Sequence, residues 1–361
     1  MSRSLTATAT ASEIRNVLTR SASALALAAA LVLGLGAQHA HADGATLEPT
    51  TQHFIDALAA KGGAAIYTLS PANARNVLAG AQSGPVAKLP ADIEAKTLPV
   101  GPTGKTKVYV VRPAGAKGTL PVVMYFHGGG WVLGDESTHD RLIRQIANGA
   151  HATVVFVDYE RSPEAKYPVA IEQDYAATKY VAEHAKEFNV DPKRLAIAGD
   201  SVGGNMTAVV ALLAKERSGA PKIAYQVLFY PVTDANFEDG SYTQFANGPW
   251  LTKAAMKWFW DAYLPDEAAR KQPTVTPLNA SLEQLKGLPA ALVITDENDV
   301  LRDEGEAYAR KLAQAGVTVT AVRYNGTIHD FVMLNAVADT PAAKGAVDQA
   351  TAALRKAFAG K

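Results

Sequence analysis

The sequence predicts an α/β fold with a mostly parallel central sheet, helices on both faces and a helical cap. Two observations lead to this prediction. From about Ala91 onward, short apolar runs alternate with segments of helical spacing, as in sheets whose strands are joined by crossover helices. The chain has 361 residues, of which 48% are hydrophobic and 19% charged, so it can bury a full core.

Composition also narrows the range of partners and chemistry. The formal net charge is zero, which argues against nucleic acid or an anionic membrane surface as the main partner. The chain has no cysteine, so disulfides, thiolate catalysis and cysteine-based zinc sites are excluded.

Residues 1–42 have the pattern of a secretory signal peptide. Arg3, Arg15 and Arg20 form a positive region, an apolar run covers 24–37, and Ala-His-Ala at 40–42 resembles a cleavage site. The apolar run is too short for a comfortable membrane span. We therefore expect Sec-type export and a periplasmic or secreted mature chain without stable membrane insertion. The alternative is an N-terminal helix in a cytosolic protein.

Residues 43–90 are alanine-rich with helical spacing, and Phe54, Leu58 and Ile66 could form one apolar stripe. Because this segment is too short to be a domain, we expect a helical cap that lies on residues 91–361. In that second part, strands are predicted at 107–112, 121–126, 152–158, 195–200, 225–230, 290–295 and 317–324. Helices are predicted at 140–148, 169–188, 206–217, 303–315 and 342–358. The region 233–288 breaks the alternation, which indicates a second cap element over the strand ends, where such sheets bind ligands.

Ser201 lies in the pattern Gly-Asp-Ser-Val-Gly at 199–203, between a strand-like run and a helix-compatible run. G-x-S-x-G in this context is typical of a nucleophile on a strained turn. The glycines at 199 and 203 remove Cβ atoms that would clash in so tight a reversal, and the helix directs its positive end at the serine. The alternative is a solvated serine in a glycine-rich turn.

A serine nucleophile needs a base and an acid that orients the base. In α/β-hydrolases the chain order is serine, acid, histidine, and His329 is the only histidine after Ser201. Three aspartates compete for the acid role. Asp296 directly follows a predicted strand, Asp303 opens a predicted helix where capping explains it, and Asp299 lies in the loop between them. We expect Asp299 to be the acid.

A developing negative charge on the substrate also needs hydrogen-bond donors. The run His-Gly-Gly-Gly-Trp at 127–131 follows a predicted strand. We expect the N–H groups of Gly128, Gly129 and Val202 to form an oxyanion hole. The alternatives are an ordinary glycine-rich turn and a phosphate-binding loop, but the sequence lacks a phosphate-loop pattern.

Together, the motifs at 127–131, 199–205, 299–303 and 328–331 resemble those of the bacterial hormone-sensitive-lipase family of carboxylesterases. The segments 159–164 and 230–234 also fit, and the similarity runs from about Phe54 to the C-terminus. Asp299 takes the position of the family's acid. Two departures are Val202, where alanine is common, and Asp330, where glycine is common. The carboxylate of Asp330 is expected to raise the pKa of His329.

The resemblance implies an α/β-hydrolase fold and a carboxylesterase for small-molecule esters of short to medium acyl chain, with a Ser201–His329–Asp299 triad. It implies no metal and no organic cofactor. His127, Glu164 and Asp200 are expected to have supporting roles. An amidase or lactonase could use the same triad. A ligand-binding receptor of this fold is the other alternative, but receptors of that kind lack the catalytic histidine.

Overall fold

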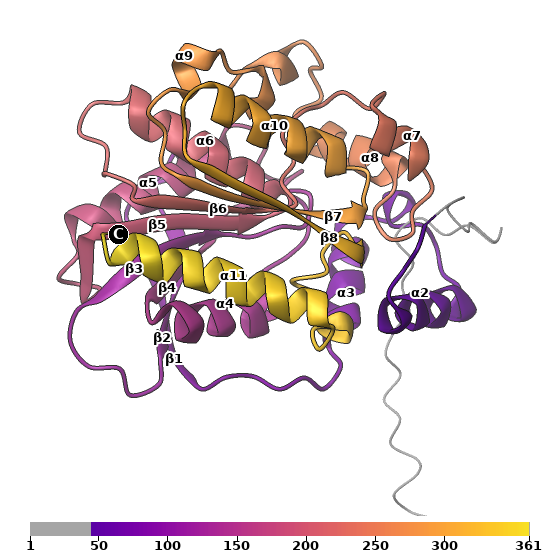
Figure 1. The fold of residues 1–361 in the computed structure, drawn as a ribbon, viewed down its shortest axis with the longest axis horizontal. Coiled ribbons are helices and arrows are strands. Elements are labelled where there is room, and N and C mark those ends of the chain that lie inside the picture. The colour runs from indigo at the N-terminus through magenta and orange to yellow at the C-terminus, as the bar shows by residue number, and fades with distance from the viewer. Residues whose placement is uncertain (1–44, 361) are drawn as a thin grey trace, which may run out of the picture.

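The computed structural model describes residues 45–360, so the predicted signal peptide lies outside the described residues. One eight-stranded sheet crosses the molecule in the order β1-β2-β4-β3-β5-β6-β7-β8 (Figure 1). The strands are β1 (Ala91–Leu98), β2 (Thr106–Pro113), β3 (Leu120–Phe126), β4 (Thr153–Asp158), β5 (Val190–Asp200), β6 (Tyr225–Phe229), β7 (Ala291–Asn298) and β8 (Val319–Ile328). All neighbours from β4 to β8 are parallel, and β2 is antiparallel to β1 and β4. The predicted mostly parallel sheet is therefore confirmed.

Strand β1 had no counterpart among the predicted strands. It is an edge strand with a largely exposed surface, and it carries Asp92, Glu94 and Lys96. Charged residues protect an edge strand from pairing with other chains, but they also remove the apolar run by which a buried strand is recognised. The central strands β3 and β4 are almost wholly buried and apolar, and both were predicted.

Helices cover both faces of the sheet (Figure 1). One face carries α4 (Glu136–Ala150) and α11 (Pro341–Phe358), and the other carries α5 (Val169–Glu183), α6 (Val202–Glu216) and α10 (Arg302–Gln314). Helix α4 begins four residues before the predicted start, because Asp135 and Thr138 form a capping box there. Helix α5 ends at Glu183 rather than 188, and the turn that follows has Asn189 at a φ of 51°.

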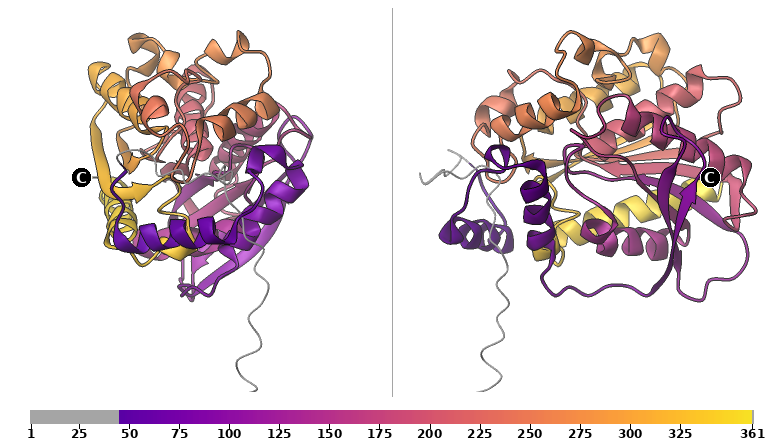
Figure 2. Two further views of the ribbon diagram at one scale, coloured as in Figure 1. Left: turned by 90° about the vertical axis from the view of Figure 1, so that its right-hand side faces the viewer. Right: turned by 180° about the vertical axis from the view of Figure 1, so that it is seen from behind.

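Two separate segments of the chain lie at the end of the sheet toward which β7 and β8 point (Figures 1 and 2). The first contains α2 (Pro49–Lys61) and α3 (Pro71–Gln82), and the second contains α7 (Gly240–Gln244) and α8 (Lys253–Tyr263). Helix α9 (Leu282–Leu285) follows later in the chain and lies toward the other end of the sheet (Figure 1). The rings of Phe54 in α2 and Trp250 before α8 have centroids 5.5 Å apart, so the two segments contact each other. Ser201, at the carboxyl end of β5, lies at this same end of the sheet.

Among the helices of residues 45–360, none combines the length and the apolar character that a membrane crossing requires.

Candidate active site

Ser201 occupies a strained turn between β5 and α6. Its φ of 56° and ψ of −120° are unusual for a residue with a side chain, and such strain persists only where the surroundings hold the backbone in place. The Ser201 N–H donates to the Phe229 carbonyl at 2.9 Å, and the Ser201 carbonyl accepts from the Val232 N–H at 3.2 Å. A Cβ at Gly203 would collide with the Phe126 carbonyl, so the turn can pack this closely against β3 only with glycine there.

His329 and Asp299 lie within hydrogen-bond reach of this turn. His329 Nε2 is 2.9 Å from Ser201 Oγ, and His329 Nδ1 is 2.7 Å from Asp299 Oδ2. All three side chains are buried. They come from the β5–α6 turn, the loop after β8 and the loop after β7, so the structure brings together the three residues that were selected as nucleophile, base and acid.

The other two candidate acids are placed differently from the prediction. Strand β7 continues to Asn298, so Asp296 lies inside the strand and Asp299 follows directly after it. Asp303 is in the first turn of α10 but does not cap that helix. Instead, its Oδ2 accepts from the Ser241 N–H of α7 at 2.8 Å, and its Oδ1 pairs with Arg302. Asp303 therefore connects α10 to the second helical segment.

The prediction that Gly128 contributes to an oxyanion hole does not fit the geometry. Its N–H donates to Asp200 Oδ1 at 3.1 Å, and the group is thereby occupied. Gly129 and Gly130 line the small cavity beside Ser201, and among the described residues their N–H groups donate to no other protein group. The N–H of Val202 is likewise free of an intrahelical partner, because Val202 is the first residue of α6.

Sequence reasoning did not single out Gly130, which lines the cavity beside Ser201. A signal that could have indicated Gly130 is the position of Asp200 directly before the serine. A buried carboxylate there needs N–H donors, and once Gly128 supplies one, the next glycines of the run are left to face the serine. Gly130 has a φ of 63°, and a Cβ there would collide with the ring of Phe259. Only glycine therefore fits at this point without displacing the Phe259 ring.

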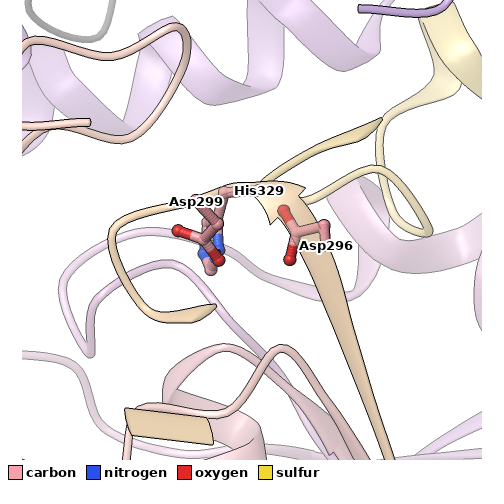
Figure 3. A group of neighbouring side chains, drawn as sticks. All are labelled: Asp296, Asp299 and His329. Carbon is pink, nitrogen blue, oxygen red and sulfur yellow. The ribbon is translucent and has the colours of Figure 1, made fainter. Parts of the chain in front are cut away.

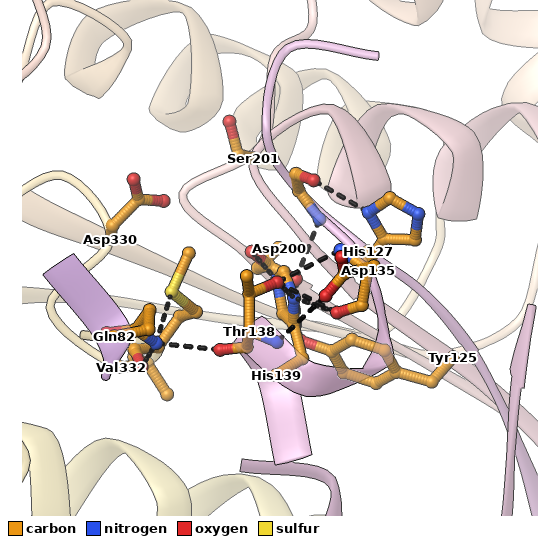
Figure 4. Close-up of polar contacts among 12 residues, drawn as sticks. Gln82, Tyr125, His127, Asp135, Thr138, His139, Asp200, Ser201, Asp330 and Val332 are labelled. Atoms are coloured by element: carbon orange, nitrogen blue, oxygen red, sulfur yellow. Dashed lines mark hydrogen bonds and ion pairs between the residues drawn. The ribbon is translucent and has the colours of Figure 1, made fainter. Parts of the chain in front are cut away.

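Asp200 is the centre of a buried polar network that holds the glycine loop (Figure 4). Besides the Gly128 N–H, its carboxylate accepts from Tyr125 Oη at 2.6 Å and pairs with His139 Nε2 at 3.3 Å. Burial alone would raise the pKa of Asp200, but His139 and Tyr125 lower it, and Asp200 in turn raises the pKa of His139. Tyr125 and His139 were not singled out from the sequence, because nothing in their local pattern indicates this contact.

His127 has a structural position in the loop rather than a charged one. Its ring stacks on Tyr159 at a centroid distance of 4.1 Å, and its Nδ1 is 2.8 Å from the Gly128 carbonyl oxygen. Complete burial lowers the pKa of His127 to about 3, so the ring is neutral at ordinary pH. A neutral stacked ring supports the glycine loop without adding charge beside Ser201.

Glu164 connects the loop after β4 to the N-terminal segment. Its two oxygens accept from Nη1 and Nη2 of Arg75 in α3 at 2.9 and 2.6 Å. Arg75 also donates to the carbonyls of Val132 and Ser162 at 2.8 and 3.0 Å. The pairing with Arg75 lowers the pKa of Glu164 to about 2. The expected supporting position of Glu164 thus has a physical basis, and Arg75 is the partner that the motif alone did not reveal.

His329 lies in a strongly negative environment. Burial favours the neutral imidazole, but Asp299 and Asp330 outweigh burial and raise the pKa of His329 to about 10. Asp330 Oδ1 is 3.5 Å from His329 Nε2, and Asp330 Oδ2 accepts from Trp250 Nε1 at 3.0 Å. Burial raises the pKa of Asp330 despite the opposing effect of His329. The influence of Asp330 on His329 therefore has the direction predicted from the sequence.

The cavity beside Ser201 is small and mostly apolar. Its volume is about 20 Å³, which is little more than one water molecule occupies on this measure. Its apolar walls come from three parts of the chain and consist of Leu78, Leu133, Leu251, Met256 and Phe259. Leu78 belongs to α3 and Phe259 to α8, so both helical segments reach the site.

A serine on a strained strand–helix turn, with a histidine and an aspartate in series beside it, defines the serine hydrolases of parallel α/β sheets. Residues 123–333 match the family model described as the alpha/beta hydrolase fold. The chain belongs to this family, in its hormone-sensitive-lipase-like group of carboxylesterases. It is a carboxylesterase-like serine hydrolase.

Individual relatives agree with this assignment. The chain is 41% identical to carboxylesterase NlhH of Mycobacterium tuberculosis over 272 residues, which cover 74% of this chain and 83% of the relative. It is 41% identical to a putative alpha/beta hydrolase, R526, of Acanthamoeba polyphaga mimivirus over 82% of this chain and 84% of the relative. The crystal structure of a thermostable esterase from Pseudomonas putida ECU1011 superposes with a TM-score of 0.85 at 56% identity, covering 87% of this chain and 98% of the other.

Proposed function

We propose that this protein hydrolyses carboxylic esters through an acyl-enzyme intermediate formed on Ser201. The observation that supports this most directly is the series of two hydrogen bonds from Ser201 to His329 and from His329 to Asp299, at 2.9 and 2.7 Å. In the first step, Ser201 Oγ attacks the ester carbonyl carbon while His329 Nε2 takes the hydroxyl proton. His329 then gives this proton to the departing alcohol.

Deacylation repeats the same chemistry with water. His329 takes a proton from the water, the resulting hydroxide attacks the acyl carbon, and the proton returns to Ser201 as the acid leaves. Asp299 remains ionised, keeps the imidazole in the tautomer with hydrogen on Nδ1, and stabilises the imidazolium.

We infer that the N–H groups of Gly129, Gly130 and Val202 stabilise the oxyanion. Each such donor contributes on the order of 3 kcal/mol to lowering the barrier. Asp200 supports this arrangement indirectly, because it holds the neighbouring Gly128 N–H. The loop then needs little reorganisation when the charge develops.

The apolar walls of the cavity favour an uncharged acyl group of short to medium length. The lining of the cavity includes Leu78 of α3 and Met256 and Phe259 of α8, so both helical segments cover the proposed nucleophile. This position supports the interpretation of residues 43–90 and 233–288 as a cap.

The test is a panel of p-nitrophenyl esters of increasing acyl length, with one p-nitroanilide of the best acyl group. We expect kcat/KM to be highest for short to medium chains and the anilide to react far more slowly. A faster anilide would favour the amidase alternative, and a panel that is inactive while lactones are opened would favour the lactonase.

We also propose export through a Sec-type signal peptide, on the pattern of residues 1–42. Periplasmic and culture fractions of an expressing bacterium should contain a chain that starts near Asp43. N-terminal sequencing of that chain tests the proposal, and an intact N-terminus in the cytoplasmic fraction would contradict it.

A further inference from the structure

Asp296 has a buried carboxyl group that accepts no hydrogen bond from the described residues around it. The side chain lies in β7 and is fully buried. Within residues 45–360, neither of its oxygens accepts a hydrogen bond from an N–H or O–H group. An ionised carboxylate in such a place is very costly, and a group of this kind takes up a proton instead.

Two residues of the proposed triad, Asp299 and His329, lie close to Asp296 (Figure 3). One oxygen of Asp296, one oxygen of Asp299 and one ring nitrogen of His329 lie within 4.8 Å of one another. Asp299 already accepts from His329 at Oδ2 and from the Leu301 N–H at Oδ1. An ionised carboxylate has about four acceptor sites, so Asp299 can accept a further hydrogen bond.

We propose that Asp296 is a neutral carboxylic acid in the working enzyme, and that its O–H donates a hydrogen bond to the Asp299 carboxylate. Asp296 is then a positioning residue for the triad. This inference rests on the proposed function, because it assigns Asp296 a role through Asp299. Burial and the charge of Asp299 both raise the pKa of Asp296 well above its usual range, in agreement with a protonated acid.

A neutral Asp296 also limits the negative charge around the base. His329 faces the carboxylates of Asp299, Asp330 and Asp296, together with the phenol of Tyr230, whose ring centroid is 4.9 Å away. Asp296 in turn is influenced by Asp299, His329, Asp330 and Tyr230. Three ionised carboxylates would hold a proton on the imidazole very tightly. With Asp296 protonated, His329 loses its proton at a lower pH and can then act as the base.

A divalent cation among Asp296, Asp299 and His329 would be another way to satisfy the buried oxygens. Such an ion would have to replace the hydrogen bond between His329 Nδ1 and Asp299 Oδ2, which is 2.7 Å long. A protonated Asp296 satisfies the same oxygens and leaves that hydrogen bond in place, so we favour the acid.

Two substitutions distinguish a role of Asp296 as a hydrogen-bond donor from a role that depends only on the size of its side chain. Asp296→Asn has nearly the same shape, is neutral, and can donate from its amide, whereas Asp296→Leu has similar size and cannot donate. We expect kcat to be largely retained in Asp296→Asn. In Asp296→Leu, kcat should fall on the order of 10–100-fold with little change in KM, because Asp299 loses its orientation. Circular dichroism and Tm show that each variant is folded.

The pH profile gives a readout that a purely structural role would not move. Asp330→Asn is the matched control, because it removes a carboxylate that lies 3.5 Å from His329. We expect the acid limb of kcat/KM to move down by about one unit in Asp330→Asn and to stay in place in Asp296→Asn. An equal shift in Asp296→Asn would mean that Asp296 is ionised, and would overturn the proposal. Unchanged kinetics in a folded Asp296→Leu would overturn the positioning role.

Infrared spectroscopy can detect the acid without turnover. In a Ser201→Ala background, we expect the carbonyl stretch of a protonated carboxylic acid that shifts in D2O and is lost in Asp296→Asn. Absence of that difference would contradict the proposal, as would loss of wild-type activity in EDTA that Mg²⁺ or Ca²⁺ restores. If the proposed function failed instead, Ser201→Ala would remain active while the infrared band was still present, so the two failures are distinguishable.

Discussion

Asp200, the residue before Ser201, accepts a hydrogen bond from the backbone N–H of Gly128 at 3.1 Å. This hydrogen bond connects the turn that carries the proposed nucleophile to the glycine loop that carries the proposed oxyanion donors. The two motifs are far apart in the sequence but are held by one carboxylate. The same carboxylate pairs with His139 and Tyr125. Any change at Asp200 therefore affects stability and the glycine loop together.

We expect Asp200→Ala to destabilise the fold by about 3 kcal/mol, because it leaves His139 in a buried site without its partner. The activity of the remaining folded protein should also fall, because Gly128 is no longer held. Urea denaturation followed by tyrosine and tryptophan fluorescence measures the first effect, and kcat below the transition measures the second. A variant of unchanged stability would show that the network contributes little.

Ser201→Ala should abolish ester hydrolysis except for a residual rate from the oxyanion donors and binding, on the order of 10³–10⁴-fold over water. The physical reason is that no other hydroxyl occupies the strained turn beside His329. Stopped-flow measurement with an activated p-nitrophenyl ester should show no burst of p-nitrophenol. A burst of full amplitude in Ser201→Ala would disprove the assignment of the nucleophile.

Asp299→Asn should keep the fold and lower kcat by up to ~10⁴, because the amide favours the wrong imidazole tautomer. Asp303→Asn is the control from the same segment. Its side-chain oxygen can still accept from the Ser241 N–H, so we expect a loss of about 1 kcal/mol or less and a kcat within a few-fold of the wild type. Steady-state kinetics and thermal denaturation of both variants decide the matter, and a reversal of the two results would mean that the acid is misassigned.

The acid limb of kcat/KM should lie well above pH 6.5, the ordinary value for histidine, because Asp299 and Asp330 raise the pKa of His329 to about 10. Activity should still be increasing between pH 7 and 9. A rate that is flat from pH 5 to 8 is incompatible with His329 as the base.

The same shift predicts a dependence of stability on pH. The folded state binds the His329 proton more tightly than the unfolded chain does, so this contribution is complete below pH 6.5 and is lost as the pH rises through about 10. Denaturation of wild type and His329→Gln across this range isolates the contribution. The stability difference between them should shrink as the pH rises.

The sequence predicted the strands that are buried and apolar, and it singled out Ser201, Asp299 and His329, which the structure brings within hydrogen-bond distance of one another in series. It did not predict β1, whose polar alternation belongs to an edge strand, or the true end of β7, where Asp296 is a buried polar residue within a strand. Contacts between distant segments were also out of reach. The donation from Gly128 to Asp200 and the pairing of Arg75 with Glu164 depend on how loops meet in space, and no local pattern encodes that.

The Glu48 N–H donates to the Gly326 carbonyl at 2.9 Å, and Asn298 Nδ2 donates to the Thr46 carbonyl at 3.1 Å. Residues near the start of the described chain thus contact the ends of β7 and β8, next to the loops that carry Asp299 and His329. His329 lies close to the C-terminus, so these contacts join distant parts of the sequence. Contacts of such long sequence separation form late in folding. A chain in which these segments have not yet packed together therefore lacks the contacts that support the proposed triad. We therefore expect hydrolytic activity to appear only after both ends of the protein have folded.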